Sequence, residues 1–172
     1  MKRIILVTGG ARSGKSTFAE ALAMRLSPNP VYLATAQALD EEMADRVRRH
    51  QERRGPAWTT VEEPLFISRC DMTGRTVLVD CLTLFASNVF FAEGEDVDVS
   101  LARLKREVDA FTVPDAQYIF VTNEIGMGGI GATATTRRYT DLLGWLNQYV
   151  ASRDDEVWLL VSGIPLCIKS QE

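Results

Sequence analysis

The sequence is poor in the residues that bind metals or cross-link a chain. It contains a single histidine, His50, and three cysteines, Cys70, Cys81 and Cys167, which lie far apart and form no C-x-x-C pair. An odd number of separated cysteines argues against a disulfide framework and is typical of reduced, cytosolic proteins. With only one histidine, a zinc site would need an unusual ligand set.

Long apolar runs and an excess of basic charge are also lacking. The apolar run at residues 4–7 is soon followed by glycines and is too short for the core of a signal peptide. The weakly polar stretch Leu82–Ala92 is too short for a membrane span. The net charge of −4 does not favour non-specific binding to nucleic acid or to an anionic membrane. We therefore expect a cytoplasmic protein with no nucleic-acid partner and no membrane insertion.

The composition is that of one folded domain. A chain of 172 residues, 46% hydrophobic and 24% charged, fits a single domain spanning residues 1–172. Short runs of Val, Ile and Leu alternate with longer helical segments, which predicts an α/β sandwich around a mostly parallel sheet. The expected strands are Arg3–Thr8, Val31–Thr35, Trp58–Val61, Thr76–Asp80, Tyr118–Thr122, Val157–Ser162 and, as an antiparallel edge, Leu166–Lys169. The expected helices are Ser16–Leu26, Asp40–Arg54, Leu82–Phe91, Val99–Phe111 and Thr135–Ser152, with Gly94–Ser100 as an exposed loop.

Residues 9–16 form a complete phosphate-binding motif between an expected strand and an expected helix. The pattern G-x-x-x-x-G-K-[ST] is matched without exception by Gly9, Gly10, Ala11, Arg12, Ser13, Gly14, Lys15 and Ser16. In such a loop, successive backbone N–H groups point at phosphate oxygens beside the positive end of a helix. We expect Lys15 to reach the β- and γ-phosphates of a nucleotide and the Ser16 hydroxyl to bind Mg²⁺.

Two acidic residues are candidates for the carboxylate that a P-loop needs near its metal. Asp80 ends an expected buried strand, as in a Walker B element, although it could instead cap the helix that starts at Leu82. Glu124 follows the strand Tyr118–Thr122 and is the second candidate. We favour Asp80 as the Mg²⁺ ligand.

The only histidine lies on the expected helix Asp40–Arg54. Met43, Val47 and His50 share one helical stripe, which predicts that His50 faces the protein. Three interpretations remain open at this point: a packed structural histidine, a surface residue near the helix C-terminus, or a nucleophile or acid–base group. Arginines on the adjacent stripe favour the third, because they could neutralise a transferring phosphoryl group.

These features occur in a recognisable order along nearly the whole chain. After the phosphate loop come Tyr32-Leu33-Ala34-Thr35-Ala36, Arg46-Val47-x-x-His50, Val79-Asp80-Cys81-Leu82-Thr83 and Thr122-Asn123-Glu124-Ile125-Gly126-Met127-Gly128. The set resembles the bifunctional adenosylcobinamide kinase / adenosylcobinamide-phosphate guanylyltransferases of cobalamin biosynthesis. The chain departs from that pattern after Gly128, where many members read I-V-P-E and this chain reads Gly129-Ile130-Gly131-Ala132.

The resemblance implies a RecA-like P-loop NTPase fold, a three-layer sandwich, assembled as a homotrimer. It implies that ATP or GTP phosphorylates the aminopropanol hydroxyl of adenosylcobinamide, and that GMP from GTP then passes through His50 to the phosphorylated corrinoid, giving adenosylcobinamide-GDP. The implied cofactors are GTP, ATP and Mg²⁺, with His50 and Lys15 catalytic. The implied nucleotide contacts are Gly9–Ser16, Ala34, Thr35, Ala36, Gln51, Glu52, Arg53, Arg54, Glu62 and Leu84.

Two alternatives carry the same phosphate loop. One is a P-loop kinase of another small molecule, in which His50 is structural and no guanylyl group is transferred. The other is a RecA-type regulatory or motor module that hydrolyses nucleotide to move a partner. The short chain argues against the motor.

Overall fold

The sheet sets the architecture of the molecule. The computed structural model describes residues 2–37, 48 and 54–170, and in this part of the chain seven strands form one sheet in the order β3-β2-β4-β5-β1-β6-β7. Neighbouring strands run parallel except β6 and β7, which are antiparallel. The strands are β1 (Arg3–Gly9), β2 (Val31–Ala34), β3 (Thr59–Glu62), β4 (Thr76–Asp80), β5 (Gln117–Val121), β6 (Glu156–Val161) and β7 (Ile164–Ser170).

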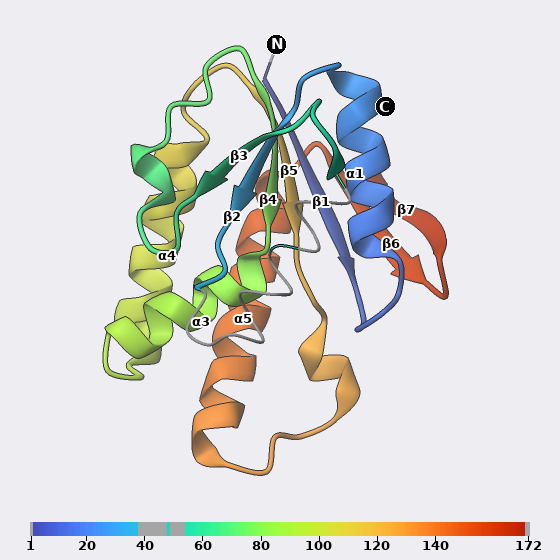
Figure 1. Cartoon of the computed structure of the whole chain (residues 1–172). Helices are drawn as coiled ribbons and strands as arrows, with labels where there is room; N and C mark the ends of the chain where they lie inside the picture. The colour runs from blue at the N-terminus through green and yellow to red at the C-terminus, as the bar shows by residue number, and fades with distance from the viewer. Residues whose placement is uncertain (1, 38–47, 49–53, 171–172) are drawn as a thin grey trace.

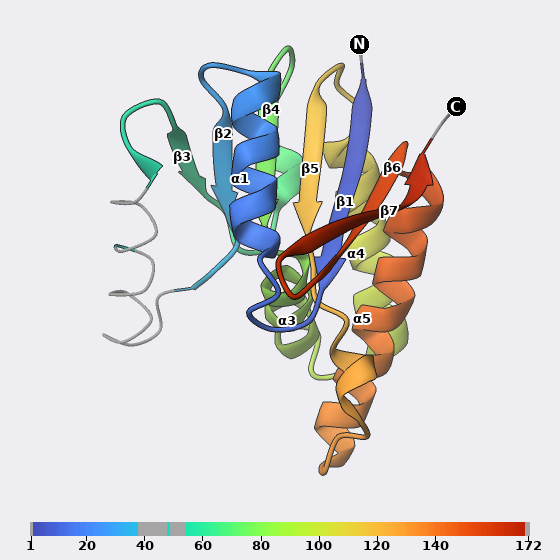
Figure 2. The same cartoon turned by 90° about the vertical axis from the view of Figure 1, so that its right-hand side faces the viewer.

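Helices cover both faces of this sheet, which confirms the predicted three-layer α/β sandwich with a mostly parallel sheet and one antiparallel edge strand (Figures 1 and 2). Helix α1 (Lys15–Leu26) packs on one face, and α3 (Leu82–Ala92), α4 (Val97–Phe111) and α5 (Ala134–Arg153) pack on the other. Two short 3₁₀ helices, η1 (Ile67–Arg69) and η2 (Ile125–Gly128), lie in connections. Of the expected helix Asp40–Arg54, only Arg48 and Arg54 lie within the described residues.

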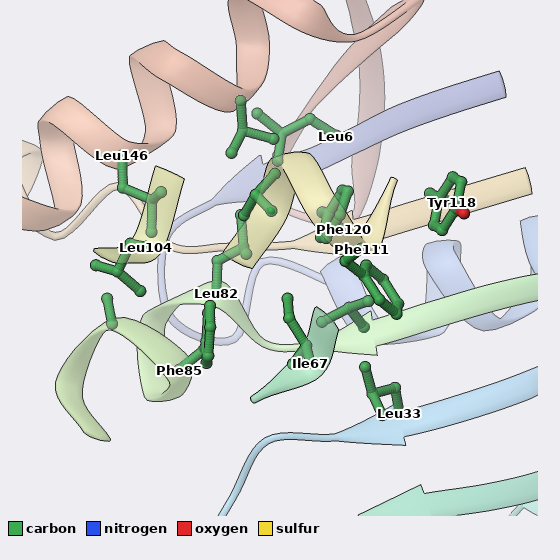
Figure 3. Packing of buried hydrophobic residues seen from close by; sticks show 14 of the residues in the cluster. Leu6, Leu33, Ile67, Leu82, Phe85, Leu104, Phe111, Tyr118, Phe120 and Leu146 are labelled. Carbon is green, nitrogen blue, oxygen red and sulfur yellow. The ribbon is translucent and has the colours of Figure 1, made fainter. Parts of the chain in front are cut away.

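Alternate strand residues supply two separate cores. Leu6 on β1 packs toward α3, α4 and α5, whereas Val7 packs toward α1. Figure 3 shows the larger core, where the rings of Phe111, Tyr118 and Phe120 meet beside the sheet. Because both faces are buried, the central strands are nearly continuous in apolar residues, which is the pattern that made them predictable from sequence.

Two boundaries differ from the predictions. The expected loop Gly94–Ser100 is wrong in its second half, because α4 begins at Val97 and the Asp96 carboxylate caps it by accepting the backbone N–H of Val99 at 2.9 Å. Strand β7 extends beyond the expected edge Leu166–Lys169. It begins directly after a tight turn in which Ser162 and Gly163 have φ of 51° and 80°, as two-residue β-hairpins require.

An acidic side chain is buried without a partner where α5 ends. Asp154 is 2% exposed, and neither carboxylate oxygen has a hydrogen-bond partner in the described part of the chain. Burial raises the pKa of Asp154 from 3.8 to about 8, against the opposing effect of Lys169. The folded protein therefore holds a proton that the unfolded chain has lost, so the free energy of unfolding falls as the pH rises between these values.

We expect Asp154→Asn to stabilise the protein at alkaline pH. Above the folded pKa the wild type carries an unpaired buried charge, which the amide removes, and the gain should exceed about 2 kcal/mol at pH 9 and vanish near pH 4. Urea unfolding at both pH values measures the difference. The control is Asp141→Asn, an exposed position on the same helix. An equal effect of Asp154→Asn at both pH values would contradict the buried charge.

Candidate nucleotide-binding site

The phosphate loop connects β1 to α1 and uses glycines where a side chain cannot fit. Gly9 has a φ of +154°, and a Cβ atom there would lie 2.6 Å from the Leu160 carbonyl oxygen. Gly14 has a φ of +95°, and its Cβ would lie 3.2 Å from the Cα of Gly163. The backbone is thus held close to the end of β6, as a cradle of main-chain N–H groups needs.

The polar groups of this loop fit a bound phosphate. The buried Ser13 hydroxyl has no hydrogen-bond partner among the described residues. The N-terminus of α1, at Gly14, has no side-chain cap. Lys15 is 8% exposed, and its ammonium donates to the Gly10 carbonyl at 2.5 Å. Unsatisfied donors and a buried cation at a helix N-terminus form an anion site.

Two opposing effects act on the Lys15 ammonium. Burial lowers the pKa of Lys15, and the nearby Cys81 and Asp80 side chains oppose that shift. A bound polyanion would act in the same direction as Asp80 and favour the charged form of Lys15. Lys15 is therefore placed both to receive phosphate and to interact with the acidic end of β4.

Asp80 ends β4 and is tied to residues of two other segments. Its Oδ2 accepts a hydrogen bond from the Tyr32 hydroxyl at 2.5 Å, and the Arg54 guanidinium lies 3.3 Å from the centre of the Tyr32 ring. Burial and Asp80 raise the pKa of Tyr32. The alternative role of Asp80 as a helix cap is wrong, because the residue at the cap of α3 is Cys81 and no side chain bonds there.

Arg54 brings unused donors to this end of the sheet. Its Nε and Nη1 are buried and have no hydrogen-bond partner in the part of the chain that the structure describes. A guanidinium with unpaired N–H groups beside Tyr32, whose hydroxyl bonds to Asp80, is suited to a phosphate or a carbonyl oxygen. Of the nucleotide contacts implied at residues 51–54, Gln51, Glu52 and Arg53 lie outside the described residues, as does His50.

Glu124 reaches the phosphate loop from the neighbouring strand. The Thr8 hydroxyl donates to Glu124 Oε1 at 3.0 Å, and the backbone N–H of Glu124 donates to the Gly9 carbonyl at 3.3 Å. Strand β5, which leads to Glu124, lies between β1 and β4 in the sheet. Both candidate carboxylates therefore lie at the phosphate-loop edge of the sheet, Asp80 near Lys15 and Glu124 against β1.

The other predicted contacts lie along the same edge of the sheet. Ala34 pairs in register with both Asp80 and Glu62, so the ends of β4, β2 and β3 form one row. Thr35 is buried and donates to the Cys81 carbonyl at 2.8 Å, and Ala36 follows it. Leu84 is half-buried on α3. Glu62 is four strands from β1, roughly 20 Å at the usual strand spacing, so it is not brought to the phosphate loop.

The turn between β6 and β7 contributes a contact that the sequence motifs do not indicate. The backbone N–H of Gly163 donates to the Ser13 carbonyl at 2.8 Å, and this bond holds the phosphate loop from the side. The signal was present in the sequence as a Ser162-Gly163 pair, which is typical of a turn. Its contact with a loop about 150 residues earlier depends on the sheet order, which pattern alone does not give.

The described residues offer no self-contained metal centre. No group of three or more His, Cys, Asp or Glu side chains among them could hold an ion, and none of their helices is long and apolar enough to cross a membrane. A magnesium ion here would need nucleotide phosphates as ligands, together with Ser16 and one carboxylate, which is how Mg²⁺ commonly binds in such sites.

Comparisons with known proteins agree over nearly the whole chain. Residues 5–168 match the family described as cobinamide kinase / cobinamide phosphate guanyltransferase. The bifunctional adenosylcobalamin biosynthesis protein CobU of Salmonella typhimurium is 39% identical, with 96% of this chain and 99% of that protein aligned. The corresponding protein CobP of Pseudomonas aeruginosa is also 39% identical, over 96% of this chain and 97% of its own length.

Solved structures similar in shape are more distant. The P4 protein of bacteriophage phi6, in complex with ADP, aligns with 95% of this chain and 52% of its own at a TM-score of 0.48 and 16% identity. The flagellar accessory protein FlaH of Methanocaldococcus jannaschii aligns with 98% of this chain and 79% of its own at a TM-score of 0.49 and 13% identity.

Proposed function

This chain belongs to the cobinamide kinase / cobinamide phosphate guanyltransferase family, and on that premise we propose that it carries out both reactions. In the first, a nucleoside triphosphate phosphorylates the aminopropanol hydroxyl of adenosylcobinamide. In the second, GMP from GTP is joined to that phosphate to give adenosylcobinamide-GDP. The observation that carries the proposal is the complete phosphate loop, with a buried Lys15 and a buried Ser13 hydroxyl that has no hydrogen-bond partner among the described residues, in a chain that matches the family almost end to end.

We assign the nucleotide to this loop in both reactions. Lys15 and the N-terminus of α1 would neutralise the phosphates, and the Ser13 hydroxyl would donate to one of their oxygens. Ser16 and Asp80 would hold Mg²⁺ when it is bound, and the ion would offset the negative charge of the phosphates. The donor for the first reaction is ATP or GTP, and the donor for the second is GTP.

The guanylyl transfer would use His50 as its nucleophile. The imidazole nitrogen attacks the α-phosphorus of GTP, a nitrogen–phosphorus bond forms, and pyrophosphate leaves with the electron pair of the broken bond. The phosphate of the corrinoid then displaces histidine from the same phosphorus. This role rests on the match of His50 to the family motif.

Identifying the corrinoid products tests the proposed function directly. Adenosylcobinamide, Mg²⁺ and ATP or GTP are incubated with the purified protein, and the corrinoids are resolved by mass spectrometry. We expect cobinamide phosphate with either donor and the GDP-linked product only when GTP is present. Phosphorylation without the GDP-linked product would favour a plain small-molecule kinase. Nucleotide hydrolysis with no modified corrinoid would favour the regulatory module.

We also propose that the protein is a homotrimer. The family resemblance is supported by the edge strand β7, on which Ile164 and Leu166, two positions apart, are 69% and 56% exposed. An unpaired edge strand with an exposed apolar row is commonly covered in a native assembly. Three copies of one chain would form a closed cyclic assembly.

We expect Leu166→Glu to shift the trimer toward the monomer. A charge placed in the apolar row must be desolvated in any interface that covers it. Light scattering after gel filtration measures the mass. Cys167→Ser, an exposed neighbour that points to the opposite face, is the control and should stay trimeric. A trimeric Leu166→Glu protein would remove β7 from the interface, and a monomeric wild type would remove the trimer.

A further inference from the structure

A small cavity opens between the segment after β5 and helix α5, beside the phosphate loop. Its volume is about 120 Å³. In Figure 1 the chain leaves β5, forms the 3₁₀ helix η2 beyond the edge of the sheet and turns back into α5. The lining residues used below are Asn123, Glu124, Met127, Gly144 and Asn147.

The amide groups of the cavity are held rigidly. Asn147 is 6% exposed, its Oδ1 accepts from the Thr122 hydroxyl at 2.7 Å, and its Nδ2 donates to the Asn123 carbonyl at 3.1 Å. The Asn123 amide nitrogen in turn donates to Thr83 Oγ1 at 2.9 Å. A connected network of this kind fixes the direction of its polar groups before any ligand binds.

A glycine in the interior of α5 keeps the cavity open. Gly144 costs the helix about 1 kcal/mol relative to alanine. Its backbone does not need glycine, and a Cβ atom there would meet no atom within 4 Å. Close packing therefore does not explain Gly144. What the glycine provides is free volume next to Asn147 and Glu124.

The size of the cavity indicates one arm of a larger molecule. A water needs only about 10–15 Å³ of such space, whereas sites that enclose a whole ligand measure about 300–1,000 Å³. Met127, one of the lining residues, is 79% exposed. An exposed apolar side chain at the mouth suits the bulky remainder of a ligand whose arm enters the cavity.

Glu124 joins this cavity to the phosphate loop. Its Oε1 is held by the Thr8 hydroxyl, and its backbone N–H by the Gly9 carbonyl. Within residues 2–37, 48 and 54–170, no group hydrogen-bonds to Oε2. One oxygen is thus fixed by β1 while the other can accept a proton at the border between the two sites.

We propose that this cavity is the acceptor subsite of the kinase reaction and that Glu124 is its catalytic base. The inference rests on the proposed function and names where the hydroxyl-bearing arm of the corrinoid enters. The arm's hydroxyl oxygen forms a bond to the γ-phosphorus, and its proton passes to Glu124. The bond from that phosphorus to the bridging oxygen breaks, and the nucleoside diphosphate leaves with the electron pair.

Filling the cavity tests the subsite. Gly144→Leu places a side chain in the free space without disfavouring the helix. We expect the KM for adenosylcobinamide to rise at least tenfold and the KM for the nucleotide to change little, with Gly144→Ala giving a smaller rise in the same direction. Gln148→Leu, exposed on the same helix, is the control. An unchanged corrinoid KM in a folded Gly144→Leu protein would overturn the subsite.

Removing the base tests Glu124 separately. We expect Glu124→Gln to lower the kcat of cobinamide phosphorylation by about 100-fold or more, as loss of a general base does. The Mg²⁺ requirement should not change, and formation of the GMP–protein adduct should fall far less than phosphorylation. An unchanged kcat would overturn the role of Glu124, and a raised Mg²⁺ requirement would make it a metal ligand instead.

The wild-type activity distinguishes the proposed function from the acceptor subsite. If the wild type phosphorylates no cobinamide, the proposed function is wrong and the acceptor subsite falls with it. If the wild type is active and both Gly144→Leu and Glu124→Gln match it, only the acceptor subsite is wrong.

Discussion

Replacing His50 with asparagine should abolish guanylyl transfer while cobinamide phosphorylation continues. Asparagine keeps a polar side chain of similar bulk and lacks the imidazole nucleophile. Loss of a catalytic nucleophile lowers a rate by about 1,000-fold or more. Direct transfer of the γ-phosphoryl group to a hydroxyl needs positioning, Mg²⁺ and charge neutralisation, none of which requires His50.

The two rates must be measured on the same His50→Asn preparation, with circular dichroism and a melting curve alongside. Arg48→Ala, which changes an exposed residue two positions earlier, is the matched control and should keep both activities. A structural role for His50 predicts a different pattern, in which both rates fall together with the melting temperature. Normal guanylyl transfer by folded His50→Asn protein would exclude His50 as the nucleophile.

Replacing Lys15 with alanine should impair both reactions, by about 100- to 1,000-fold each. Lys15 is buried in the phosphate loop near Asp80. Its loss would remove the cation that we assign to the triphosphate, and the negative charge of Asp80 would lose a nearby positive charge. We propose that both reactions begin with a nucleoside triphosphate in the same loop, so both rates should fall.

Initial rates of each reaction at saturating nucleotide measure this effect. Lys2→Ala, an exposed lysine next to the opposite end of β1, is the control for loss of a positive charge. Retention of near wild-type rate by Lys15→Ala in only one reaction would mean that the two reactions use different nucleotide sites.

The parts of the site that are local in sequence could be predicted, and the parts that depend on the sheet order could not. The phosphate loop is one contiguous motif between a strand and a helix, and the structure places it there. The contact of Thr8 with Glu124 joins residues 116 positions apart. It exists because β5 inserts between β1 and β4, and hydrophobic patterning does not specify strand order.

The strands and helices could be predicted from the sequence more accurately than the residues at which some of them begin or end. Buried parallel strands are recognisable in sequence as apolar runs. Each expected strand therefore matches an observed strand whose two ends lie within two residues of the expected ends. The start of α4 was misplaced because the acidic run before it indicated a loop, while Asp96 acts as a helix cap. The burial of Asp154 had no signal, since an acid at the end of a helix is usually solvated.

The central claim, that this P-loop protein passes GMP through a histidine, is tested most directly by labelling the wild type with GTP carrying radioactive α-phosphate. After denaturation, we predict at most one label per active site, bound covalently to the protein and lost in acid, as expected for a phosphorus–nitrogen bond. The label should be absent from His50→Asn and strongly reduced in Lys15→Ala. A protein that takes no label from the α-phosphate, and only releases the γ-phosphate to water, would contradict the claim.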